Sequence, residues 1–125
     1  MNNYQYDKPL RVSYHFPAAL VTTAGVVGAL QGPEGRKGRI VELSYSVEVD
    51  TNDVAEITLD TNAGLTTPLA LAVANAPGVN ACAVATRASI EATSELPADT
   101  VVELQVTVDT TTAGSVNVTA VVEWY

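Results

Sequence analysis

An alternating pattern runs through residues 41–49, whose sequence is VELSYSVEV. Apolar and polar side chains change places at each step, and successive side chains of a β-strand point to opposite faces. The pattern therefore predicts a strand with one buried and one solvated face. Tyr45 falls on the apolar face, so we expect its ring to point inward.

The same period of two returns in three other stretches. Residues 55–60 read AEITLD, residues 102–109 read VELQVTVD, and residues 116–124 read VNVTAVVEW. Turn-forming residues separate the first two strands at 50–53 and the last two at 110–115. This spacing predicts two hairpins, one near each end of the segment 40–125.

The segment between these hairpins is harder to assign. Its alanine content favours a helix, whereas Pro68, Pro77 and Gly78 divide it into short pieces. We expect short strands at 69–73 and 82–86, with one short helix within 80–92 as the alternative. Seven or eight mostly antiparallel strands with turns about every ten residues predict an all-β fold, a single-domain β-sandwich or small jelly roll.

The composition of the chain excludes several classes of function. The 125 residues are 47% hydrophobic, enough for one domain with a substantial core. A net charge of −8 repels nucleic acid, and the most apolar run, 18–30, is too short to span a bilayer. We therefore expect neither a nucleic-acid partner nor a membrane. The single cysteine, Cys82, excludes an internal disulfide and a multi-thiolate metal site.

Charge divides the chain after Arg39. Residues 1–39 contain five of the six Lys and Arg residues but only two of the 14 Asp and Glu residues. Four of the seven aromatic residues lie within the first sixteen positions. We expect residues 1–39 to form a basic, aromatic, extended N-terminal arm and loop, and residues 40–125 to form an acidic sandwich body.

Such an arm suits docking, because Tyr and Arg are the side chains that most often anchor protein interfaces. The aromatic pair at the end of the chain suggests an edge covered by the arm or by another chain, and hence a homo-oligomer, with a trimer favoured. The residues expected to contact a partner are Tyr4, Tyr6, Lys8, Arg11, Tyr14, Phe16, Arg36, Lys37, Arg39, Trp124 and Tyr125.

Side chains suited to catalysis or metal binding are scarce. His15 has no Ser or Cys nucleophile beside it and is expected to pack or form hydrogen bonds, and Cys82 is expected to be a buried, inert thiol. Asp50, Asn52 and Asp53 carry the oxygen ligands that calcium prefers. Asp60 and Asn62 also carry such oxygens. They follow the strand predicted at 55–59, so they lie at its opposite end and cannot share one calcium ion with the first group. We therefore expect these acidic residues to lie in solvated turns that hold no metal. We also expect no catalytic residue and no cofactor, so that the chain is not an enzyme.

Three stretches resemble the small virion proteins of tailed bacteriophages. They are GRIVELSYSVEV at 38–49, LPADTVVELQVT at 96–107 and GSVNVTAVVEWY at 114–125. In that group, capsid decoration or cement proteins are β-sandwich or jelly-roll domains, often trimers, on the outer shell. The resemblance implies a non-enzymatic structural protein on the capsid exterior, made in the host bacterial cytoplasm, with the major capsid protein shell as its partner. A secreted or cell-surface β-sandwich module that binds carbohydrate is the alternative.

Overall fold

The computed structural model describes residues 9–61, 64–65, 68–86 and 95–125, and within these ranges the chain forms nine β-strands and no helix. None of the described residues therefore belongs to a helix capable of crossing a membrane. The strands are β1 (Leu10–Leu20), β2 (Gly25–Gln31), β3 (Gly38–Val49), β4 (Ala55–Thr61), β5 (Leu69–Val73), β6 (Cys82–Thr86), β7 (Glu95–Leu96), β8 (Val101–Asp109) and β9 (Ser115–Trp124).

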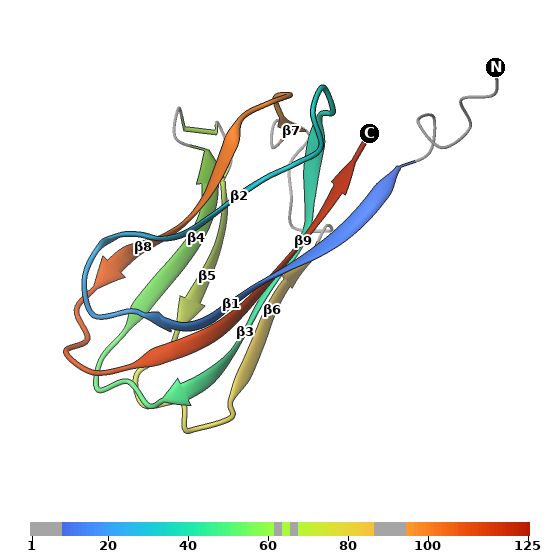
Figure 1. The fold of residues 1–125 in the computed structure, drawn as a ribbon. Coiled ribbons are helices and arrows are strands. Elements are labelled where there is room, and N and C mark those ends of the chain that lie inside the picture. The colour runs from blue at the N-terminus through green and yellow to red at the C-terminus, as the bar shows by residue number, and fades with distance from the viewer. Residues whose placement is uncertain (1–8, 62–63, 66–67, 87–94) are drawn as a thin grey trace, which may run out of the picture.

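Two antiparallel sheets make up the fold (Figure 1). The first has the order β1-β9-β3-β6, with the short β7 paired to the beginning of β3. The second has the order β2-β8-β4-β5. The predicted β-sandwich is confirmed, and so are the short strands at 69–73 and 82–86. The alternative helix is absent from residues 80–86, and the rest of its predicted range lies outside the described residues.

Alternation along the strands builds the core. In β3, Leu43, Tyr45 and Val47 are buried between more exposed polar neighbours, as residues 41–49 predict. In β9 the residues from Val116 to Trp124 follow the same rule, and every second side chain is buried. In the described ranges, twenty-one buried hydrophobic residues form one cluster, and all but Val21 of the β1–β2 turn come from the two sheets. Burial of apolar area at roughly 25 cal/mol per Å² is the main force that holds the sheets together.

Neither predicted hairpin forms. β3 pairs with β9 through Tyr45↔Val118, whereas β4 pairs with β8 through Leu59↔Leu104, so the turns at 50–54 and 110–114 cross between the sheets. Turn-forming residues permit both a hairpin and such a crossing. Strand pairing in this fold is set by long-range burial, which the local pattern does not encode.

Pairing between the longer strands is nested. β1 pairs with β9, β2 with β8, β3 with β6 and β4 with β5. The chain can be described as one long double-stranded ribbon whose closed end is the β4–β5 connection. Winding of this ribbon places its two open ends, the start of β1 and the end of β9, at the same end of the molecule (Figure 1).

The described part of the expected arm belongs to the sandwich, which corrects the prediction for residues 10–31. β1 pairs with β9 from Leu10↔Trp124 to Leu20↔Ser115, and β2 pairs with β8. The reason lies in a pattern that the charge division obscured. Inward residues at 12, 14 and 16 alternate with the polar Arg11, Ser13 and His15, which is the period of a strand.

Candidate functional site

The described Lys and Arg residues gather at one end of the sandwich, where β1 and β3 begin and β9 ends. We call this group, Arg11, Arg36, Lys37, Arg39 and Tyr125, the cationic end. All five are among the residues predicted to contact a partner. Tyr4, Tyr6 and Lys8 lie outside the described residues.

A row of charges crosses the first sheet at the cationic end. Register places Arg11 beside Glu123 and Glu123 beside Arg39 on three adjacent strands. The Arg11 guanidinium lies 3.1 Å from one Glu123 carboxylate oxygen, and Nε of Arg39 lies 4.0 Å from the other. Glu123 thus sits between two cations, and its side chain is only 16% exposed against 56% and 47% for the arginines. The positive groups therefore face outward.

Tyr125 joins the row to the neighbouring turn. Its backbone pairs with Lys37 through bonds of 2.8 and 3.1 Å, and the Arg39 guanidinium lies 4.7 Å from its ring centroid. The Tyr125 hydroxyl donates to the Glu95 carboxylate, and Nζ of Lys37 lies 3.7 Å from the same group. A cation over an aromatic face is attracted by the ring quadrupole, so Arg39 is held in an oriented position.

The hydrogen bond from Tyr125 lowers the pKa of Glu95 below its ordinary value of 4.5, and Lys37 and Arg39 act in the same direction. Burial, followed by the bond to Glu95, raises the pKa of Tyr125. Because the folded-state pKa of Glu95 is lowered, its stabilising contribution is present above the unfolded value and is lost as the pH falls through the folded value.

We expect Tyr125→Phe to raise the pKa of Glu95 toward 4.5, because the variant keeps the ring and removes the donor. Carbon-13 NMR titration of the Glu95 carboxyl in both proteins measures the change. Equal midpoints in the two titrations would show that the hydroxyl does not stabilise this carboxylate in solution.

Trp124 lies beneath this surface rather than on it. The side chain is 1% exposed, and its Nε1 donates to the Tyr14 hydroxyl at 2.9 Å. A Cβ at Gly32 or Gly38 would come within 2.5 Å of the indole ring, so both glycines are needed for its close packing. Phe16 packs in the same inward direction, against Gly28. The prediction that Trp124, Tyr14 and Phe16 contact a partner is therefore corrected, because these side chains pack inside their own subunit.

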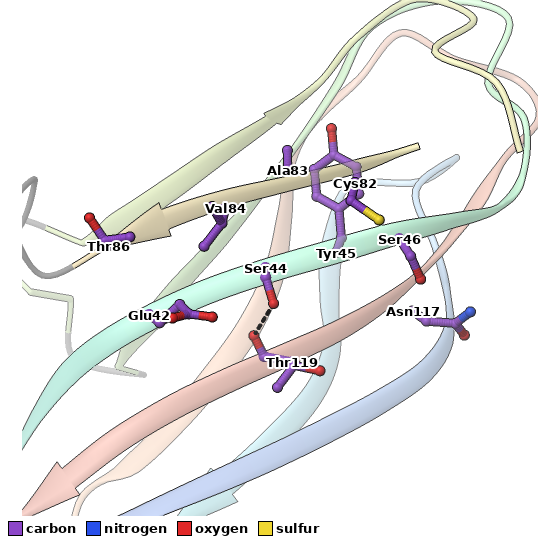
Figure 2. Close-up of a pocket in the computed structure, with 10 residues that line it drawn as sticks. All are labelled: Glu42, Ser44, Tyr45, Ser46, Cys82, Ala83, Val84, Thr86, Asn117 and Thr119. Atoms are coloured by element: carbon purple, nitrogen blue, oxygen red, sulfur yellow. Dashed lines mark hydrogen bonds between the residues drawn. The ribbon is translucent and has the colours of Figure 1, made fainter. Parts of the chain in front are cut away.

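A shallow groove of about 550 Å³ lies on the outer face of the first sheet, over β6, β3 and β9. Figure 2 shows its small polar lining, in which the Ser44 hydroxyl donates to the Thr119 carbonyl at 3.5 Å. Tyr45 points away from this face, as predicted, and its hydroxyl donates to the Ala72 carbonyl at 2.9 Å. Burial raises the pKa of Tyr45. The groove is lined by Glu42, Ser44, Tyr45, Ser46, Cys82, Ala83, Val84, Thr86, Asn117 and Thr119.

Side chains of the types that catalysis uses lie in or beside the groove, and each forms a hydrogen bond. Nδ1 of His15 lies 3.1 Å from the Thr119 hydroxyl, and Ser44 bonds a backbone carbonyl. Cys82 is exposed, which corrects the predicted buried thiol, and its sulfur donates to the Asn80 carbonyl at 3.4 Å. The position next to solvent follows from its place on the outer face of an edge strand.

The acidic turns use their oxygens to hold the backbone. Asp50 Oδ1 accepts from the amides of Thr51 and Gly78, each at 3.0 Å. Asp60 Oδ1 accepts from Thr61 at 2.7 Å and from Leu65 at 2.6 Å, at the other end of β4. Within the described ranges, no three His, Cys, Asp or Glu residues are grouped closely enough to hold a metal ion.

Sequence reasoning found the cations but missed the acids that orient them. Glu95 begins the two-residue strand β7 in a segment without clear periodicity, so nothing local marked it as a partner of Tyr125. Glu123 was visible as a polar position on a predicted strand. Its two arginine neighbours required the β1-β9-β3 order, which depends on the whole topology.

Comparison of the chain with known proteins gives no relative: no family model, curated protein or solved structure matches it.

Proposed function

We propose that the chain is a non-enzymatic virion structural protein that attaches to the outside of a phage capsid and stabilises it by bridging shell subunits. The partner is the shell of major capsid protein, and the cationic end supplies one contact. The proposal keeps a homo-oligomer, with a trimer favoured, because symmetric copies would multiply the number of contacts with the shell.

The observation that carries this proposal is the sorting of charge over the described surface. The cations lie at one end with outward guanidinium and ammonium groups. The four strands of the second sheet, in contrast, contain four acidic residues and no Lys or Arg. Complementary potentials orient partners during encounter and discourage the wrong approach. An acidic partner would therefore meet the cationic end, with the second sheet turned to solvent.

The nested strand pairing supports the finer fold assignment. We propose that the sandwich is a jelly roll, because its four antiparallel pairs wind as one ribbon across two sheets. Jelly rolls occur in viral capsid and lectin domains, so the fold suits both the proposed function and the alternative. Fold alone does not choose between them.

The positions of the aromatic side chains favour the structural role over carbohydrate binding. Sugar-binding surfaces use exposed aromatic rings as platforms. In the described part of the chain, Tyr45 and Trp124 are buried and Tyr14 packs against the core. Tyr125 is half-buried, with Arg39 over its ring. These positions leave little flat aromatic surface for a sugar.

Attachment to empty shells of the phage that encodes the chain tests the proposal, with co-sedimentation as the measurement. We expect the protein to sediment with shells and to raise the temperature at which they burst. Lys37→Gln should weaken attachment about fivefold and reduce its dependence on salt, because an exposed cation at an interface acts mainly through long-range attraction.

Ala70→Glu is the matched control, since it changes the net charge by the same amount on the exposed surface of β5. It should leave attachment nearly unchanged. Equal losses from both variants would mean that net charge matters and the cationic end does not. If shells with and without the protein burst at the same temperature, the stabilising role is ruled out.

A further inference from the structure

The loops at the end opposite the cationic end are joined to one another by hydrogen bonds. We call the residues 20–25, 49–54, 74–81 and 109–115 the loop tip. Thr51 Oγ1 donates to the Ala74 carbonyl at 2.8 Å, and Asn52 Oδ1 accepts from the Thr112 amide at 2.9 Å. The Val21 amide donates to the Gly114 carbonyl at 3.3 Å. Each loop is thus tied to a neighbour, so the surface is ordered before it meets a partner.

Close packing reinforces this order. Gly114 has a φ of +137°, and a Cβ there would lie 2.7 Å from a Thr51 methyl carbon. The Ala24 amide donates to Asp109 Oδ2 at 3.2 Å, which fixes the β1–β2 turn on the last residue of β8. A preordered surface loses less conformational entropy on binding than a flexible one.

Exposed aliphatic side chains are concentrated on the loop tip. Of the seven large hydrophobic residues exposed in the described ranges, four belong to it, and Val26 is the second residue of β2, next to its segment 20–25. Single exposed aliphatic residues are ordinary, whereas a group framed by polar residues marks an interaction surface. The four are Leu20 at 62%, Val49 at 51%, Val54 at 43% and Val79 at 59% exposure.

The polar frame of the loop tip is acidic. Asp50, Asp53 and Asp109 lie in it, Glu48 precedes it, and its described residues include no Lys or Arg. A partner that covers the aliphatic side chains must therefore bring positive charge close to these carboxylates. The same charge disfavours anionic lipid and a second acidic tip.

We infer that the loop tip is a second docking surface, and that its partner is a protein surface of aliphatic side chains framed by Lys or Arg. The inference rests on the proposed function for the identity of that partner, a neighbouring shell subunit. A protein that bridges two subunits needs two separate contact surfaces. The loop tip and the cationic end lie at opposite ends of the sandwich and meet this requirement.

Two exposed valines make a matched test. Val79 lies in the loop tip at 59% exposure, and Val84 lies in β6 at 54% exposure, outside it. With wild-type attachment to shells as reference, we expect Val79→Ser to bind about tenfold more weakly and Val84→Ser to bind unchanged. Equal thermal unfolding of both variants checks that the fold is retained. If the wild-type protein binds shells and the two variants bind equally well, the inference is overturned.

A second arm separates this inference from the proposed function. The probe is a hexylamine resin, which presents alkyl chains beside positive charge. We expect Val79→Ser to elute earlier than Val84→Ser. If wild-type protein fails to bind shells while this difference persists, the capsid role is wrong and the docking chemistry of the tip stands. If the elution is equal, the tip does not recognise such a surface.

A second copy of the chain is the other possible occupant of the loop tip, and sedimentation of the protein alone tests it. If the protein self-associates and Val79→Ser abolishes this self-association, the loop tip binds another copy, which contradicts a shell partner.

Discussion

Trp124→Ala is expected to lower the free energy of unfolding by about 3–5 kcal/mol, the range for removing a large buried aromatic side chain. The indole is 1% exposed, and Gly32 and Gly38 pack directly against its ring. Chemical denaturation monitored by circular dichroism measures the loss.

Tyr14→Phe tests the contribution of the indole hydrogen bond alone. It removes the hydroxyl that accepts from Trp124 Nε1 at 2.9 Å and keeps the aromatic ring. We expect a loss of about 1–3 kcal/mol, the cost of a buried donor without a partner. A loss below about 1 kcal/mol for Trp124→Ala itself would contradict the assignment of this residue to the core.

Deletion of residues 1–20 is expected to abolish cooperative unfolding, because it removes β1 together with Tyr14 and Phe16. β9 would become an edge strand, and the indole of Trp124 would lose its hydrogen bond and part of its cover. The free energy of unfolding of a domain is only about 5–15 kcal/mol. We expect the loss of an eleven-residue strand to cost at least this much.

The matched deletion removes residues 1–8 and leaves β1 complete. We expect that protein to unfold in one cooperative transition, as measured by differential scanning calorimetry. If residues 21–125 alone unfolded with wild-type cooperativity, β1 would be an attached arm and its pairing with β9 would contribute nothing to stability.

Much of the fold follows from period two. Residues 41–49, 55–60, 102–109 and 116–124 all lie in strands, and most of their apolar side chains face inward as predicted, because alternation is a local property that burial enforces. Val49 was predicted on the inward face but is 51% exposed, and the register of β3 shifts between Val47 and Val49. Which strands pair with each other is not a local property. The turns at 50–53 and 110–115 predicted hairpins, and the structure uses both as crossings between sheets.

The N-terminal segment shows how charge can hide a strand. Arg11, Ser13 and His15 gave the segment a polar character, and Pro17 follows them directly after Phe16. Their partners at 12, 14 and 16 nonetheless face inward, and the register of β1 shifts between Phe16 and Ala19, beside that proline. A proline is tolerated in an edge strand, where an amide donor can be spared.

The candidate site was predictable in part. The arginines, Lys37 and Tyr125 stood out by type, because the chain has only six Lys and Arg residues against 14 Asp and Glu residues. Their arrangement around Glu123 and Glu95 was not, since it needs four strands brought together from distant positions. The aliphatic side chains of the loop tip were equally hidden. Exposure of Val79 and burial of Val73 cannot be read from the shared residue type.

Electron cryomicroscopy of shells incubated with the protein tests the central claim, that this sandwich attaches to the outside of a capsid and bridges its subunits. The account predicts extra density on the outer surface that fits the two-sheet sandwich, with its cationic end against one subunit and the acidic second sheet toward solvent. Bare shells at saturating protein concentration, or density in which the cationic end points away from the shell, would contradict it.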